Sequence, residues 1–251
     1  MTKVVATVLA LAAPLLAESP LVIPHIADGG GWRSSIVVVS TFALETTRLT
    51  IKFRADDGRK VAFPIQNYGT IDTLDVELPA DSSLYLETTG TSPSVRVGWV
   101  EVDQLTGALP VRGFAVFRQS VPGRPDFEAV STGMRAAAAV VFPFDNTNGL
   151  ETGFALVNLS TAACTIAVSP IVDEFGRSLT TVPRLAANLL SSGHVSFVAT
   201  DRLPELAGRR GFLKFYPSFG CGAGGFAMLG LRFNPTGPFT NLVPLSVTSP
   251  F

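Results

Sequence analysis

Only a few side chains in this sequence could carry out acid–base chemistry. The chain of 251 residues contains two histidines, His25 and His194, and a general base must lie within hydrogen-bond reach of the group it deprotonates. His25 stands shortly before Asp28 and could act as a base beside that carboxylate. A strand-end histidine that binds a loop is the simpler alternative, and the serine clusters at 34–35 and 191–193 lack the Gly-x-Ser-x-Gly pattern of a nucleophile elbow. We therefore expect a protein without enzymatic activity.

Oxygen-bearing side chains gather in the segment Asp145-Asn-Thr-Asn-Gly149. Carboxylate and amide oxygens bind Ca²⁺, so Asp145 and Asn146 are candidate ligands, and Asp28 could serve a sister loop. The segment does not follow the EF-hand spacing, because the glutamate of the twelfth position is missing. Asp and Asn also favour turns for backbone reasons. A calcium site and a plain turn both stay open.

Trp32 is the best candidate for an aromatic ring that binds a ligand. It directly follows Gly29-Gly30-Gly31, a turn with unusual backbone freedom, and an exposed ring there could stack on a sugar. Trp99 instead stands in a strand-like segment and is expected in the core. The weak ligand-binding set is therefore Asp28, Trp32, Asp145, Asn146 and Asn148, with no catalytic residue.

The composition restricts the class of protein. The net charge is −1 and only 16% of the residues are charged, so no long-range field attracts nucleic acid. The chain is 47% hydrophobic and contains 23 Gly and 18 Pro, which favours short strands joined by tight turns. We expect an all-β fold.

Residues 1–19 follow the plan of a secretory signal peptide. Lys3 precedes an apolar run from Val4 to Leu16, and Ala17 is a small residue at the expected cleavage region. The run is short for a membrane span, and we expect no transmembrane span elsewhere. The expected location is secreted, periplasmic or at the cell surface. A cytosolic protein with an apolar first strand is the alternative.

The chain contains two cysteines, Cys164 and Cys221. In an oxidising compartment they could form a disulfide that closes a long loop, which stabilises a fold by about 4 kcal/mol in the chain-entropy model. Two unpaired thiols are the alternative, and the spacing matches no zinc site.

The segments Val22–Val39 and Val141–Val157 share one pattern: an apolar-Pro pair, a polar turn with glycine, and an apolar strand. Further matches follow in the same order. They are Gly58-Arg59 with Gly176-Arg177, Leu84 and Leu86 with Val195 and Phe197, Gly98–Val102 with Gly211–Phe215, and Arg118 with Arg232. Such self-similarity indicates a duplicated unit. We expect two tandem antiparallel β-sandwich modules, residues 20–132 and 133–251, related by internal duplication.

The seam between the modules, Ser131–Arg135, is too short and too apolar for a free tether. We therefore expect the modules to pack against each other, around a pseudo-two-fold axis.

Three motifs carry a resemblance: Ile23–Ser34 (IPHIADGGGWRS), Pro143–Gly149 (PFDNTNG) and Gly230–Gly237 (GLRFNPTG). In these segments the chain resembles a family of secreted bacterial proteins of uncharacterised activity with a paired module. The resemblance covers nearly everything after the signal peptide, but it implies no catalytic or ligand-binding residues.

The expected function is extracellular adhesion, surface or matrix assembly, or ligand binding. Its partner would be an extracellular or cell-surface protein or glycan, or a second copy of the chain. A carbohydrate-binding or carbohydrate-active protein is the first alternative, and an outer-membrane β-barrel is the second.

Overall fold

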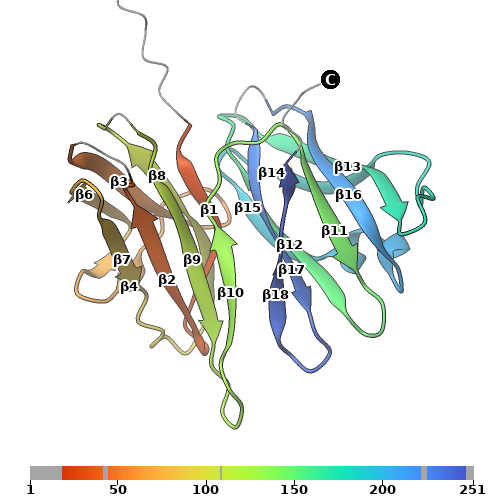
Figure 1. Cartoon of the computed structure of the whole chain (residues 1–251), viewed down its shortest axis with the longest axis horizontal. Coiled ribbons are helices and arrows are strands. Elements are labelled where there is room, and N and C mark those ends of the chain that lie inside the picture. The colour runs from red at the N-terminus through yellow and green to blue at the C-terminus, as the bar shows by residue number, and fades with distance from the viewer. Residues whose placement is uncertain (1–18, 42–44, 108, 222–224, 247–251) are drawn as a thin grey trace, which may run out of the picture.

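The computed structural model describes residues 19–41, 45–107, 109–221 and 225–246, and Figure 1 shows the arrangement of their strands. The predicted signal peptide lies outside these ranges, except for Ser19. Helical turns in the described ranges are confined to α1 (Ala199–Arg202) and η1 (Pro204–Leu206). No helix in these ranges is long and apolar enough to cross a membrane. The prediction of an all-β, antiparallel fold is confirmed.

The first module consists of two four-stranded sheets and a small hairpin. Sheet A has the order β1 (Leu21–Asp28), β8 (Arg96–Gln104), β3 (Thr47–Arg54) and β6 (Thr73–Leu78). Sheet B has the order β10 (Phe127–Thr132), β9 (Arg112–Gln119), β2 (Trp32–Val39) and β7 (Ser83–Glu87). Sheet C is the hairpin of β4 (Phe63–Ile65) and β5 (Gly69–Ile71).

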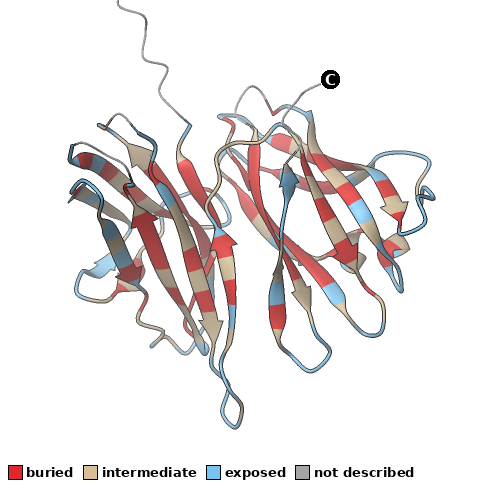
Figure 2. Ribbon diagram, in the orientation of Figure 1, coloured by how far each residue is buried: buried red, intermediate tan, exposed pale blue. Residues whose placement is uncertain are grey.

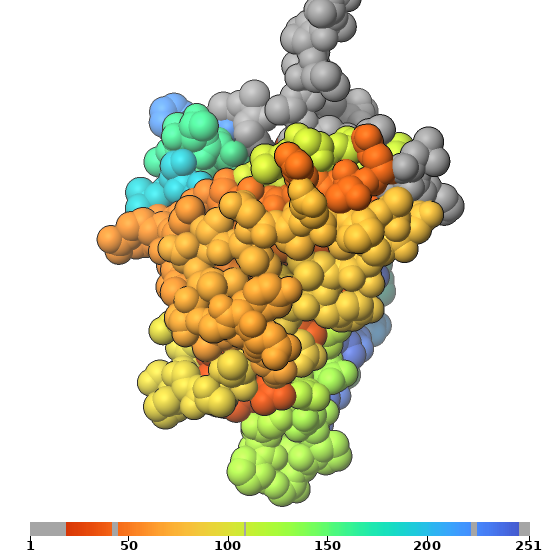
Figure 3. Space-filling model, turned by 90° about the vertical axis from the view of Figure 1, so that its left-hand side faces the viewer, coloured from red at the N-terminus to blue at the C-terminus, as the bar shows by residue number. Residues whose placement is uncertain are grey.

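The second module also consists of two stacked sheets. Sheet E has the order β14 (Arg184–Leu189), β13 (Cys164–Asp173), β16 (Arg210–Phe219), β11 (Val140–Asp145) and β19 (Leu245–Ser246). Sheet D has the order β15 (His194–Val198), β12 (Glu151–Asn158), β17 (Phe226–Phe233) and β18 (Phe239–Leu242). Figure 3 views the molecule from the side of the first module, with the second module behind it.

Each module has its own core between its two sheets. In β3, Leu49, Ile51 and Phe53 are buried, whereas the residues between them are more exposed. This period of two is the alternation that a strand requires when one face is covered. Figure 2 shows the same alternation along many strands. In the second module Phe142, Phe154 and Phe215 occupy the corresponding space.

The two modules have the same strand order. The series β1-β8-β3-β6 of sheet A recurs as β11-β16-β13-β14, and β10-β9-β2-β7 of sheet B recurs as β18-β17-β12-β15. The register agrees as well, because Ile36 faces Leu86 and Phe154 faces Phe197. The origin of this correspondence in a duplication, and the exact domain limits, stay predictions.

The hairpin turns after β3 and β13 are also alike. Gly58 and Gly176 have φ angles of 81° and 80°, a region that glycine adopts without steric cost. Each glycine N–H donates to the carbonyl oxygen three residues earlier, at Ala55 and Asp173. The sequence match of the two turns is therefore a structural match.

The predicted match of Arg118 with Arg232 is wrong by one position. Arg118 lies opposite Arg33, and Arg232 lies opposite Thr152. The serine and threonine at the corresponding places of β2 and β12 are Ser34 and Thr152, which make the same backbone hydrogen bonds. The residue of β17 that corresponds to Arg118 is thus Phe233, and not Arg232.

The modules pack edge against face. The side of the first module that carries β1 and β10 lies against the outer face of sheet D. One contact cluster joins Val22 and Trp99 to Val157 and Ala227. A second, larger cluster includes Phe117 of the first module and Phe239 of the second. The predicted pseudo-two-fold packing is therefore wrong, because a two-fold contact would bring the same face of each module together.

Candidate functional site

A β-bulge in β1 places His25 at the boundary between the modules. The ladder with β8 shifts register between Ile23 and Ile26, where Pro24 has no N–H to donate. β11 pairs with β16 without such a shift, so the first module has one extra residue here. The N–H of His25 donates instead to the Ser131 hydroxyl, at 3.1 Å. Bulges commonly redirect a side chain next to a functional site.

His25 contacts a histidine that is remote in the sequence, and that histidine contacts an aspartate. Its Nδ1 lies 3.4 Å from Nε2 of His194, and Nδ1 of His194 lies 2.8 Å from Oδ1 of Asp56. Asp56 belongs to the turn after β3, and His194 begins β15 of the other module. The His194 side chain is completely buried. The three groups therefore form a chain of polar contacts across the module boundary.

The turn that carries Asp56 is held against the second module by close backbone contact. A Cβ atom at Gly58 would lie 2.5 Å from the carbonyl oxygen of Ser191, so only glycine fits there without movement. The His194 N–H donates to the backbone oxygen of Asp56 at 2.8 Å. The position of the carboxylate relative to His194 is thus fixed by the backbone as well as by the side chains.

The order of the three groups favours one pair of tautomers when both imidazoles are neutral. An ionised carboxylate only accepts hydrogen bonds, so Nδ1 of His194 carries the proton and donates to Asp56. Nε2 of a neutral His194 is then an acceptor, and Nδ1–H of His25 donates to it. This arrangement leaves Nε2 of His25 as a free lone pair, with no hydrogen-bond partner among the described residues.

Burial keeps His25 neutral. Desolvation of the ring and the neighbouring His194 lower the pKa of His25 to about 3, although Asp56 acts in the opposite direction. The residue as a whole is only half-buried, but its ring lies among the aromatic side chains of the boundary. We attribute the low pKa to that enclosure. At neutral pH His25 is therefore an uncharged imidazole with one donor and one acceptor nitrogen.

His25 lies in the wall of a pocket between the modules, with a volume of about 270 Å³. The first module contributes His25, Trp32 and Phe117, and the second contributes the rest of the lining. Those residues are Gly153, Phe154, Ala155, Ser196, Phe197, Val198, Leu229, Leu231 and Phe233. The lining is therefore largely apolar and aromatic, with the imidazole as its main polar group.

Trp32 does not stand alone on the surface as a sugar-binding platform would. Its ring stacks on Phe239 at 5.7 Å and lies 5.9 Å from the ring of Phe117. Both contacts belong to an apolar cluster that spans the two modules. Trp32 is half-buried and contributes one wall of the pocket.

Asp28 does not pair with His25. It is buried, and its Oδ1 accepts a hydrogen bond from the N–H of Gly90 at 2.7 Å. Successive side chains of a strand point to opposite faces, and the bulge turns His25 toward His194 instead. His25 and Asp28, which the sequence offered as a base and a carboxylate, are thus not brought together.

The oxygen-bearing side chains after β11 bind their own loop. Asp145 Oδ1 accepts from the N–H and hydroxyl of Thr147, at 3.1 and 2.7 Å. Asn146 is buried and accepts from the N–H of Thr152 at 2.6 Å. Asn148 has a φ of 53° and forms the turn itself. The described residues contain no group of three or more His, Cys, Asp or Glu suited to a metal ion. Calcium binding stays a prediction.

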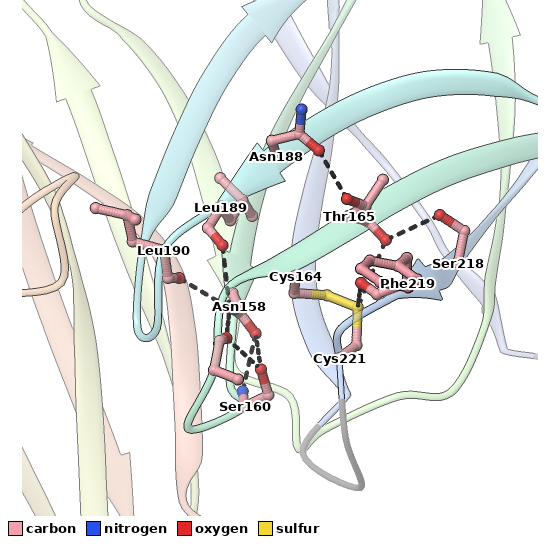
Figure 4. The surroundings of a disulfide bond; sticks show 11 residues. Asn158, Ser160, Cys164, Thr165, Asn188, Leu189, Leu190, Ser218, Phe219 and Cys221 are labelled. Atoms are coloured by element: carbon pink, nitrogen blue, oxygen red, sulfur yellow. Dashed lines mark hydrogen bonds between the residues drawn. A yellow bond between two sulfur atoms is a disulfide. The ribbon is translucent and has the colours of Figure 1, made fainter.

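Cys164 and Cys221 form the predicted disulfide, which ties the start of β13 to the segment after β16 (Figure 4). Close to it, the Asn158 amide donates to the backbone oxygens of Ala162 and Leu190, each at 2.8 Å. The bond and the amide thus hold one end of the second module together. Both lie away from the pocket lining.

Comparison with protein-family models, with curated proteins and with solved structures found no match. The resemblance to secreted bacterial proteins stays a prediction. The site itself depends on Asp56, His194, Phe117 and Phe197, which we did not predict. One signal for it was present, because Ile23-Pro-His-Ile26 is one residue longer than Phe142-Pro-Phe144.

Proposed function

We propose that this is an extracellular binding protein that holds a small aromatic or alkyl ligand in the pocket between its modules. The observation that carries the proposal is the free Nε2 of His25 in a wall made mainly of apolar side chains. Binding sites for small molecules are usually apolar hollows with a few polar groups that fix the orientation of the ligand. The ligand would carry one hydroxyl or N–H that donates to His25.

The size of the pocket restricts the ligand further. A volume of about 270 Å³ is at the lower end of known ligand pockets and suits a one-ring or two-ring compound. The rings of Trp32, Phe117 and Phe197 offer faces and edges for aromatic contact. An extracellular location is supported by the disulfide, because such bonds persist in oxidising compartments.

Phenol and toluene test the proposal, because they have nearly the same shape and only phenol can donate a hydrogen bond. Titration calorimetry with the purified mature protein should show binding of phenol and weaker binding of toluene. Trp32 lines the pocket, so its fluorescence should respond to phenol. A Trp99→Phe variant, which changes the tryptophan outside the pocket, assigns that signal.

A His25→Phe variant keeps the ring and removes the acceptor. It should bind phenol and toluene alike, with phenol binding weakened by about tenfold, as expected for the loss of one hydrogen bond. Phenol binding to the wild type should be constant between pH 5 and 8, because His25 remains neutral there. Absence of phenol binding, or an unchanged preference in His25→Phe, would refute the proposal.

A further inference from the structure

A polar pocket lies on the surface of the second module, between the turn after β13 and the loop that precedes β16. We call it the Arg209 pocket, and its volume is about 440 Å³. The lining combines charged side chains with one aromatic ring and consists mainly of Asp173, Glu174, Phe175, Arg177, Arg209 and Arg210. Three guanidinium groups and two carboxylates leave one positive charge in excess. The nearby Asp145 pairs with Arg232 at 3.8 Å and does not offset it.

Four of the five charged groups are fixed in pairs. Oδ2 of Asp173 accepts from Nε of Arg177 at 2.7 Å, and its Oδ1 accepts from two backbone N–H groups of the same turn. Glu174 accepts from Nε of Arg210. The terminal nitrogens of Arg177 and Arg210 have no hydrogen-bond partner in the part of the chain that the structure describes. The two pairs therefore hold N–H donors in place without using all of them.

Arg209 carries the excess charge. It is exposed, and its guanidinium makes no hydrogen bond or ion pair with any described residue. Its backbone is nevertheless fixed, because its carbonyl oxygen accepts from the N–H of the buried Asn146 at 2.8 Å and its N–H donates to Leu206 at 3.2 Å. In the first module Arg96 has the corresponding place, two residues before the matching glycine, and donates to the carbonyl oxygen of Ala62. The second module thus leaves free a cation that the first module uses internally.

Phe175 gives the pocket an exposed aromatic ring. The residue is 73% exposed, and the guanidinium of Arg177 lies 5.1 Å from the centre of its ring. The corresponding residue of the first module, Asp57, instead pairs with Arg59 at 2.6 Å. An aromatic ring beside fixed donors and acceptors suits a sugar, because hydroxyls both donate and accept hydrogen bonds while the C–H face of the sugar packs on the ring.

We propose that the Arg209 pocket binds an acidic sugar, whose carboxylate pairs with the guanidinium of Arg209 and whose ring packs on Phe175. A guanidinium matches a carboxylate through two parallel hydrogen bonds. The hydroxyls of the sugar accept from the free nitrogens of Arg177 and Arg210 and donate to the carboxylate of Glu174. A volume of about 440 Å³ is within the range of known ligand pockets and accommodates roughly one to two sugar rings.

Digalacturonate and its dimethyl ester test the proposal, because they share the rings and hydroxyls and only the acid carries carboxylates. Titration calorimetry at low salt, where charge pairing is least screened, should show binding of digalacturonate. The ester should bind roughly tenfold more weakly or less, as expected for the loss of a charge-assisted pair. Acetate has the carboxylate without the sugar ring and should also bind at least about tenfold more weakly than digalacturonate.

Variants assign the binding to the pocket. Arg209→Gln should lower the affinity for digalacturonate by roughly tenfold or more, and Arg209→Lys should lower it less, because lysine keeps the charge without the planar fork. Phe175→Leu should weaken digalacturonate and leave acetate unchanged. Arg112→Gln is the matched control, because Arg112 is an exposed arginine of the first module, outside the pocket. It should bind like the wild type, and circular dichroism should show all variants folded.

Four results would overturn the proposal: no binding of digalacturonate, equal binding of acid and ester, acetate bound as tightly as digalacturonate, or an equal loss in Arg112→Gln. Phenol binding between the modules should be unchanged in Arg209→Gln, because the two pockets share no residue. The two binding proposals therefore stand or fall separately.

Discussion

The outer faces of sheets A and E occupy equivalent places in the two modules and differ in chemistry. On sheet A, Glu101 accepts hydrogen bonds from Lys52 at 2.9 Å and from Arg54 at 2.6 Å, and Arg54 lies over the ring of Trp99. On sheet E, Val172 lies opposite Phe212 where Arg54 lies opposite Trp99, and Lys214 replaces Glu101. The same strand order therefore supports a face rich in paired charges in one module and a face that combines apolar residues with Lys214 in the other.

The charged groups of sheet A are held in their ionised forms by one another. Burial alone would raise the pKa of Glu101, but the hydrogen bonds from Arg54 and Lys52 hold it below its usual value. Burial would lower the pKa of Lys52, and its contacts with Asp103 and Glu101 raise it instead. The comparison teaches that strand order is set by the core, whereas each outer face follows from what lies against it.

The largest expected difference between the modules comes from the disulfide. Cys164 lies opposite Leu189, as Thr47 lies opposite Leu78, so the first module has a threonine where the second has a covalent link. A Cys164→Ala/Cys221→Ala variant should lose about 4 kcal/mol of stability in the second module. Urea unfolding followed by circular dichroism measures this loss, while the fluorescence of Trp32 and Trp99, which belong to the first module and contact the second, reports on the boundary between the modules.

Reduction provides the control for that experiment. A reducing agent should destabilise the wild type by a similar amount and leave the double variant unchanged. If reduction leaves the free energy of unfolding of the wild type unchanged, the disulfide does not stabilise the second module relative to the first.

The next largest expected effect on stability comes from His25, which lies in the bulge of β1 and has no counterpart in β11. Its native pKa of about 3 lies below the value of 6.5 in the unfolded chain, so below pH 6.5 the unfolded chain binds a proton that the native protein does not. Stability should therefore fall as the pH decreases, by about 2 kcal/mol between pH 6.5 and 5. Urea unfolding at each pH measures the slope, and His25→Gln should flatten it. An identical slope in the variant would show that His25 is not the source.

The smallest expected effect is a gain in stability at the counterpart of Cys164. The Thr47 hydroxyl is buried without a hydrogen-bond partner among the described residues. Thr47→Val should raise the free energy of unfolding by about 1 kcal/mol, because valine has the same shape without the unsatisfied oxygen. Thr88→Val is the control, since the Thr88 hydroxyl accepts from the N–H of Ser34 at 2.9 Å. That variant should lose stability, and a loss in both would refute the interpretation of Thr47.

The strands and the correspondence of the modules followed from local patterns. Alternation in Leu49–Phe53 marks a half-buried strand, and the match of Leu84 with Val195 needs only a comparison of two segments. The contact of His25 with His194 could not be found in this way, because the residues are 169 positions apart and lie in different modules. Nothing in the spacing of either residue indicates its partner.

The packing of the modules was mispredicted for a physical reason. Which sheet faces of the two modules meet depends on the sizes of their side chains. An internal repeat in the sequence does not by itself indicate those faces. Residues Gly153–Asn158 of β12 and Phe226–Leu231 of β17 are buried on both faces, and small residues such as Ala155 and Ala227 allow close approach there. That absence of polar alternation was the signal that sheet D is covered on its outer side.

The segment between the modules is bonded to both of them. Met134 exchanges two backbone hydrogen bonds with Val22, and Ala137 exchanges two with Phe226. A protease must bind a stretch of extended, unpaired backbone before it can cleave, and the pairing of Met134 and Ala137 leaves only short unpaired stretches in this segment while the protein is folded. Limited digestion of the native protein should therefore not release either module intact, so any ancestral unit has lost its independence as a separate body.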